Sequence, residues 1–228
     1  MIAAIVVGAA PAAPAVLLLV FGPDRLEQFE RAVVDGERHL MDPAPQDVTL
    51  LTGSSYFELW ETSPEDLEGL DTVNVGIAGT KIGDQIHYLD RLVVPFRPRA
   101  LVVYAGSNDI SGFPFFSKPA EEVFTLVKKY VALVHGQFPH FPIYYVAITE
   151  APIRQGVREE IQQANQMLSD WADQTGEIAF INTASALLTP SGDIDSPLFR
   201  ADQLHLNAEG YAKFAAVISD ALAYAPQK

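Results

Sequence analysis

The stretch Leu51-Thr52-Gly53-Ser54-Ser55-Tyr56-Phe57-Glu58-Leu59-Trp60 carries the chain from a strand into a helix. An apolar run at residues 48–51 is short and stops at Gly53, which is typical of a buried strand. A serine at such a corner can stand clear of the sheet, beside the free backbone N–H groups of a helix start. An exposed hydroxyl next to such donors is what a nucleophilic serine requires. The alternative is a plain Gly-Ser turn with a serine N-cap.

Apolar runs alternate with amphipathic stretches along the rest of the chain. We expect strands at residues 48–51, 72–75, 100–104, 143–147 and 178–181, and helices at residues 23–40, 82–94, 120–137, 157–174 and 208–224. This alternation predicts an α/β fold, a three-layer α/β/α arrangement around a central five-stranded parallel sheet. In such sheets the functional site lies at the carboxyl ends of the strands.

The composition is that of a globular chain with an acidic surface. Hydrophobic residues make up 49% of the 228 residues and charged residues 19%, so the chain can bury a large core. Fifteen Lys and Arg residues stand against 29 Asp and Glu residues, a formal charge of -14. We expect no nucleic-acid partner, because this surface repels phosphate backbones. The absence of cysteine excludes disulfides, thiolate catalysis and Cys-ligated zinc.

Residues 1–22 carry no charged side chain and are rich in Ala, Val and Leu. They are long enough to cross a bilayer, so we expect a signal peptide or a membrane anchor, and hence an exported protein that is periplasmic, secreted or membrane-anchored. An apolar strand and loop inside the fold, with a cytoplasmic location, is the alternative. Residues 23–45 are expected to form a helical arm and linker, and residues 46–228 the main domain.

Two motifs follow expected strands and could donate hydrogen bonds. Gly79 lies in Asn74-Val75-Gly76-Ile77-Ala78-Gly79-Thr80, where glycines let a backbone N–H point into a pocket. Asn108 lies in Tyr104-Ala105-Gly106-Ser107-Asn108-Asp109, and its amide could donate to an oxyanion. Each segment can also be an ordinary turn.

Two histidines have a carboxylate three residues before them. In Asp202-Gln203-Leu204-His205 the carboxylate could orient the ring and stabilise its charged form. The same spacing occurs in Asp84-Gln85-Ile86-His87, but inside an expected helix. A loop at the edge of the sheet suits a proton shuttle better than a rigid helix flank, so we expect His205 rather than His87 to be functional.

In their order along the chain, these motifs resemble the SGNH/GDSL hydrolase family, in its Gly-Ser-Ser subtype. The resemblance covers residues 48–224 and implies a flavodoxin-like fold and a serine esterase that forms an acyl-enzyme. It implies Ser55 as the nucleophile, with His205 and Asp202 completing a triad. It implies Ser55, Gly79 and Asn108 as the oxyanion-hole donors, and no metal or cofactor.

The substrate is less well defined by the sequence. The resemblance implies a small-molecule, glycan or lipid ester. Phe113, Phe115 and Phe116 follow the Asn108 motif and could wall an acyl pocket, or pack on the core instead. Two alternatives on the same fold stay open: a non-catalytic carbohydrate- or lipid-binding module, and an assembly factor anchored to a membrane through residues 1–22.

Overall fold

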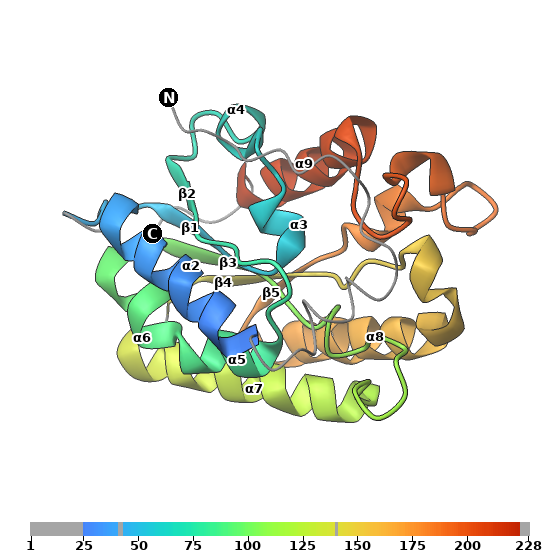
Figure 1. The fold of residues 1–228 in the computed structure, drawn as a ribbon, viewed down its shortest axis with the longest axis horizontal. Helices are drawn as coiled ribbons and strands as arrows, with labels where there is room; N and C mark the ends of the chain where they lie inside the picture. The colour runs from blue at the N-terminus through green and yellow to red at the C-terminus, as the bar shows by residue number, and fades with distance from the viewer. Residues whose placement is uncertain (1–24, 41–42, 140, 224–228) are drawn as a thin grey trace.

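A five-stranded parallel sheet forms the middle layer of the computed structural model, which describes residues 25–40, 43–139 and 141–223 (Figure 1). The strand order is β2-β1-β3-β4-β5 and every pairing is parallel. The strands are β1 (Thr49–Gly53), β2 (Thr72–Asn74), β3 (Ala100–Tyr104), β4 (Ile143–Val146) and β5 (Ala179–Ile181). The predicted α/β fold is thereby confirmed. The expected signal or anchor at residues 1–22 lies outside the described residues.

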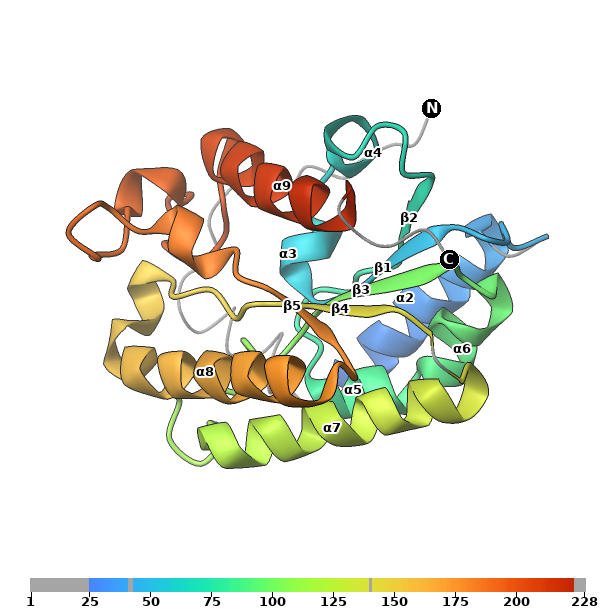
Figure 2. The same ribbon diagram turned by 180° about the vertical axis from the view of Figure 1, so that it is seen from behind.

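Helices cover both faces of this sheet (Figures 1 and 2). One face carries α2 (Arg25–Leu40), α5 (Ile82–His87), α6 (Leu89–Leu92), α7 (Ala120–Gln137) and α8 (Arg158–Thr175). The other carries α3 (Ser55–Glu58), α4 (Ser63–Asp66) and α9 (Ala208–Ala223). The short 3₁₀ segments are η1 (Val94–Phe96), η2 (Pro152–Val157), η3 (Ala184–Leu187) and η4 (Ser196–Leu198).

Two hydrophobic cores lie between these layers, because both faces of the strands are apolar. Leu50 of β1 belongs to the core under α5 to α8, whereas Leu51 points into the core under α3 and α9. The second core is rich in aromatic rings, and Tyr56 and Trp60 are both buried in it. The nucleophile candidate therefore begins a helix that packs directly on this aromatic core.

The predicted helix at residues 82–94 is wrong as a single element. The backbone leaves the helical conformation at Tyr88, with φ -96° and ψ 8°, so that α5, α6 and η1 follow one another. Breaking the segment lets Ile82 at its start and Leu89 and Leu92 near its end all be buried. A straight amphipathic helix would follow one line, whereas this segment bends over the sheet.

Helix α2 packs on the main domain. Phe29 and Val33 are buried in the first core. Arg91 of α6 pairs with Glu30 at 2.8 Å and with Glu37 at 2.6 Å. The boundary at residue 46 stays a prediction, but α2 is part of the packed structure. Across the described residues, no helix is both long and apolar enough to span a membrane.

Candidate active site

Ser55 lies where β1 gives way to α3. Gly53 has φ +146°, and a Cβ there would lie 2.0 Å from the carbonyl oxygen of Tyr104 on β3. Only glycine therefore lets β1 end so close to its neighbour. Ser54 is buried and extended, and its N–H donates to the same Tyr104 oxygen at 3.0 Å. The chain then turns into α3, which leaves Ser55 partly exposed at the carboxyl edge of the sheet.

The structure brings Ser55, His205 and Asp202 together although Ser55 and His205 lie 150 positions apart in the sequence. His205 Nε2 lies 3.0 Å from Ser55 Oγ, and His205 Nδ1 lies 2.7 Å from Asp202 Oδ2. The other Asp202 oxygen accepts the backbone N–H groups of Leu204 at 2.9 Å and of His205 at 3.0 Å. The imidazole is thus held between a hydroxyl and a carboxylate, in a geometry that can move a proton.

Asp202 is suited to remain ionised in this place. Partial burial would raise the pKa of its carboxyl, but the bonds from the His205 ring and from two backbone N–H groups outweigh burial and hold the pKa well below its usual range. The side chains of Asp202 and His205 are 30% and 19% exposed, so both stay within reach of solvent.

The loop that carries His205 is hydrogen-bonded to helix α3, which begins at Ser55. The Tyr56 hydroxyl donates to the carbonyl of Leu204 at 2.7 Å, and the Tyr211 hydroxyl donates to the carbonyl of Tyr56 at 3.0 Å. The loop also closes on itself, since the Arg200 N–H donates to the carbonyl of His205 at 2.7 Å. These bonds fix the distance between the two halves of the site.

Gly79 lies in a tight turn beside Ser55. The Thr80 N–H donates to the carbonyl of Ile77 at 3.3 Å, and Gly79 has φ +80°, which is the type II turn that favours glycine at its third position. The Gly79 N–H belongs to the central peptide of the turn and is not used in closing it. The turn is tied to β1, because the Ile77 N–H and the Thr80 hydroxyl both donate to the carbonyl of Gly53, at 2.9 and 3.1 Å.

Asn108 is buried after β3 and faces the same turn. Its Nδ2 donates to the carbonyl of Thr80 at 3.1 Å, which places the amide beside the residue that follows Gly79. The next residue, Asp109, is fully buried and accepts the N–H of Ile82 at 3.0 Å. Burial raises the pKa of Asp109 to about 6, against the lowering effect of the Ile82 bond. The five residues expected from the sequence therefore lie at one edge of the sheet.

A family model confirms the resemblance that the motifs suggested. Residues 51–213 match the model of the GDSL-like lipase/acylhydrolase family. The chain belongs to this family. The match spans most of the sheet, from the end of β1 into α9, and it supports a hydrolase of the esterase type. No curated protein sequence matches the chain.

Solved structures share the fold of this GDSL-like hydrolase. A candidate platelet activating factor from Streptococcus pneumoniae is 22% identical, with a TM-score of 0.76 over 93% of this chain and 100% of that one. A GDSL-like lipase from Bacteroides thetaiotaomicron is 18% identical, with a TM-score of 0.71 over 86% and 98%. An acetylxylan esterase from Geobacillus stearothermophilus is 16% identical, with a TM-score of 0.60 over 78% and 94%.

The remaining sequence candidates are one histidine and the three phenylalanines that follow the Asn108 motif. His87, the other histidine with a carboxylate three residues before it, is the last residue of α5. Its ring packs edge-on against Tyr88 with centroids 4.7 Å apart. Phe115 is fully exposed and Phe116 is 48% exposed, whereas Phe113 is partly buried. In this conformation the outer two rings face solvent, and their role in an acyl pocket stays a prediction.

Three residues with a place in the site were missed or left open by sequence reasoning. Tyr56 and Glu58 follow Ser55 in α3, and the Glu58 carboxylate accepts the N–H of Ala78 in the glycine turn. Burial raises the pKa of Glu58, opposed by that bond and by the charge of His205. Arg154 lies in η2 and binds Asn108. The segment that follows β4 also contains Thr149, Glu150 and Gln155, so no local sequence pattern singles out Arg154.

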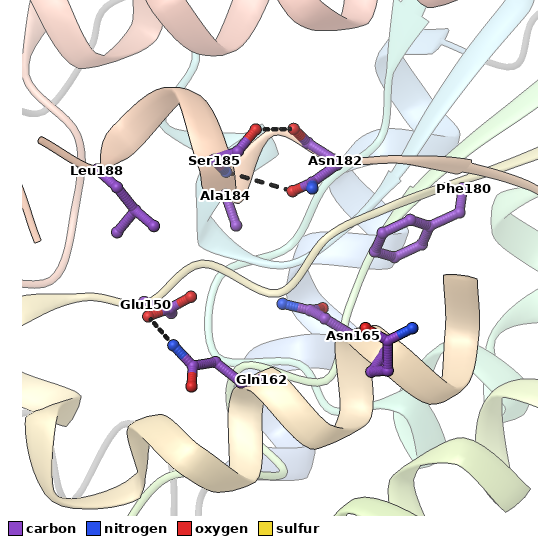
Figure 3. A pocket seen from close by; sticks show the side chains of 9 residues that line it. Glu150, Gln162, Asn165, Phe180, Asn182, Ala184, Ser185 and Leu188 are labelled. Carbon is purple, nitrogen blue, oxygen red and sulfur yellow. Dashed lines mark hydrogen bonds between the residues drawn. The ribbon is translucent and has the colours of Figure 1, made fainter. Parts of the chain in front are cut away.

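A polar cavity of about 220 Å³ opens beside β5 (Figure 3). Glu150 and Gln162 form one wall, and Asn182 and Ser185 face them. None of the residues that line it is one of the five expected site residues. Within the ranges that the structure describes, no group of histidine and carboxylate side chains is arranged to hold a metal ion.

Proposed function

We propose that this GDSL-like hydrolase is a serine esterase that cleaves carboxylic esters through an acyl-enzyme. The observation that carries the proposal is the continuous chain of hydrogen bonds from Asp202 through His205 to Ser55. The family supports ester hydrolysis in general, and this chain of bonds supports serine as the nucleophile.

We propose a role for each of these three residues. The Ser55 hydroxyl donates to His205 Nε2, so the imidazole can take its proton as the oxygen attacks the ester carbonyl. Asp202 accepts from Nδ1 and stabilises the imidazolium that forms. His205 then returns the proton to the leaving alcohol. Water, deprotonated by the same histidine, then attacks the acyl-enzyme; the bond from the acyl carbon to Ser55 Oγ breaks, His205 returns the proton to Oγ, and the acid is released.

The negative oxygen of the tetrahedral intermediate requires preorganised donors. We assign this role to the backbone N–H groups of Ser55 and Gly79 and to Asn108 Nδ2. The type II turn leaves the Gly79 N–H outside the turn's own bond, and Asn108 Nδ2 carries a second hydrogen besides the one given to Thr80.

Hydrolysis of p-nitrophenyl acetate, butyrate and octanoate by the wild-type protein and by Ser55→Ala tests the proposal. We expect turnover that disappears in Ser55→Ala, and the trend with chain length measures the acyl site. Equal turnover in both proteins would refute serine catalysis. If neither protein turned over any of the three esters, a fluorophosphonate probe that labels wild type and spares Ser55→Ala would be required to keep the proposal.

Asn108→Ala tests the oxyanion assignment separately. We expect kcat to fall by about two to three orders of magnitude with little change in KM, because the lost donor acts on the transition state. A rise in KM at unchanged kcat would instead assign Asn108 to substrate binding.

We also propose that residues 1–22 direct export or anchoring. The support is their uncharged, apolar composition. Cell fractionation of the full chain beside a chain that lacks residues 1–22 tests this, and the same soluble, cytoplasmic distribution of both would refute it.

A further inference from the structure

Arg154 is a buried cation at the carboxyl edge of the sheet. It is 7% exposed and lies in the 3₁₀ segment η2, which follows β4. Among the residues that the structure describes, no carboxylate forms an ion pair with its guanidinium. Burial lowers the pKa of Arg154, because the charged form loses solvent. The charge of the buried Asp109 opposes this lowering from a distance, and the hydrogen bonds of the guanidinium must supply the rest of its stabilisation.

All three acceptors of the guanidinium belong to the turn that carries Asn108. Nη1 donates to the carbonyl of Ile110 at 2.9 Å and to the carbonyl of Ser107. Nη2 donates to Asn108 Oδ1 at 3.1 Å. The planar, rigid fork of an arginine fits such a set of acceptors, whereas the point charge of a lysine does not. The Arg154 side chain therefore binds two backbone carbonyls of this turn and one side chain in it, that of Asn108.

This contact decides which way the Asn108 amide faces. A guanidinium has only donors, so the atom that faces it must be the amide oxygen. Nδ2 is then directed to the opposite side, where it donates to the carbonyl of Thr80 at 3.1 Å. A flipped amide would place an acceptor where the negative oxygen forms and would repel it. The charge also polarises the amide, which strengthens its N–H as a donor.

The segment that carries Arg154 is itself held at both ends. Glu150, just before η2, accepts from Gln162 at 2.9 Å and pairs with Arg158 at 2.5 Å (Figure 3). The Ile153 N–H donates to the carbonyl of Gln203 at 3.0 Å, within the loop of Asp202 and His205. Arg154 therefore starts from a fixed backbone that also contacts the other half of the site.

We propose that Arg154 is a positioning residue that holds the Asn108 carboxamide with its N–H toward the oxyanion. This role rests on the proposed serine mechanism. It is a separate claim, because an esterase could use Asn108 without needing Arg154 to orient it.

The test is a double-mutant cycle between Arg154→Met and Asn108→Ala. For each of the four proteins, kcat and KM are measured on p-nitrophenyl acetate. In the otherwise wild-type protein, Arg154→Met should lower kcat about 10- to 30-fold, less than Asn108→Ala does, because Thr80 still favours the correct amide orientation. KM should change by less than about 2-fold. In the Asn108→Ala protein the same substitution should lower kcat by less than about 3-fold, because the group it orients is absent.

Arg99, at the opposite end of the sheet, is a control for losing an arginine that binds loop carbonyls away from the site; unlike Arg154 it is exposed and pairs with Asp71 at 3.7 Å. It also binds backbone carbonyls of two loops, those of Asp47 at 2.7 Å and of Leu70. Arg99→Met should lower the melting temperature while kcat stays within about 2-fold of wild type. If Arg154→Met does not fold, Arg154→Lys replaces it in the cycle, with a smaller loss of kcat expected, since an ammonium can satisfy only part of the acceptor set.

Equal losses of kcat in both Asn108 backgrounds, or wild-type kcat in Arg154→Met, would overturn the positioning role while Ser55-dependent hydrolysis still stood. Absence of Ser55-dependent reaction in the wild-type protein would refute the proposed function and this role with it. The two failures are distinguishable, because the second requires no Arg154 variant.

Discussion

Replacing Tyr56 by phenylalanine removes the hydroxyl that joins the two halves of the proposed machinery. Tyr56 follows Ser55 in α3, and its hydroxyl donates to the carbonyl of Leu204, next to His205, at 2.7 Å. The ring is buried and stacks on Tyr104 with centroids 4.5 Å apart. Burial raises the pKa of Tyr56 well above its usual value, so the hydroxyl remains a donor at every working pH. Phenylalanine keeps the ring and its packing, and only the hydrogen bond is lost.

The lost bond should lower the free energy of unfolding by about 1 kcal/mol, the usual net contribution of one hydrogen bond. In a chain of this size that is a fall in melting temperature of about 2–4 °C. If this energy of about 1 kcal/mol also holds His205 opposite Ser55, its loss makes the arrangement in which the two side chains are in contact about five-fold less favoured. We therefore expect kcat to fall about 3- to 10-fold. KM should not change, because Tyr56 lies in the core beneath the site.

Steady-state kinetics on p-nitrophenyl acetate and thermal unfolding of the same samples measure both effects. Tyr130→Phe is a control for removing a buried hydroxyl outside the site: Tyr130 is equally buried on α7 in the other core, and its hydroxyl has no hydrogen-bond partner among the described residues. Its kcat should equal that of wild type. A Tyr56→Phe protein that is less stable but has wild-type kcat would refute the link between this bond and catalysis. Unchanged stability and unchanged kcat together would refute the bond itself.

Four further substitutions test the site and its frame. His205→Ala should abolish Ser55-dependent ester hydrolysis and His87→Ala should keep it within about 2-fold, and the reverse result would make the helical histidine the functional one. Asp202→Asn should cost stability above pH of about 4, where the wild-type carboxylate is ionised in both the folded and the unfolded chain. The difference should shrink below that pH, because the unfolded chain takes up the proton first; urea unfolding at pH 6 and pH 3 measures it, and an equal difference at both would contradict the lowered pKa. Gly53→Ala should cost about 3 kcal/mol in urea unfolding, because its Cβ would meet the Tyr104 carbonyl, and a neutral result would contradict the strand contact.

The sequence predicts the elements best where one physical signal dominates. The strand at residues 100–104 and the helix at residues 120–137 have the predicted bounds, because one is a short apolar run and the other a long amphipathic stretch. The predicted helix at residues 82–94 is wrong because its periodicity persists through Tyr88, where the backbone bends. The local sequence pattern indicates which side chains are apolar. It does not predict where a helix must bend to follow the curved face of the sheet.

For the site, the sequence predicts the residues but not the contacts between them. Ser55 and His205 were paired through the family resemblance, since no local pattern joins positions 150 residues apart. The bond of Tyr56 to Leu204 spans 148 positions and that of Arg154 to Asn108 spans 46 positions. Spacing rules act within a few residues, so they have no means of finding such partners.

The strand order explains how residues far apart in the sequence come together at the site. β1 lies between β2 and β3, so the loop of Ser55 has the loops of Gly79 and Asn108 as its neighbours. β4 lies next to β3, which brings η2 and Arg154 to Asn108. In a parallel sheet, a group that positions a catalytic side chain should therefore be sought first on the loop after the adjacent strand. The position of His205 has a different origin. Its loop follows β5, the strand at the edge of the sheet, and the chain runs back from there to Ser55 after the central strand β1. The Tyr56 hydroxyl binds this loop directly, whereas the proposed oxyanion donors lie on loops that follow neighbouring strands.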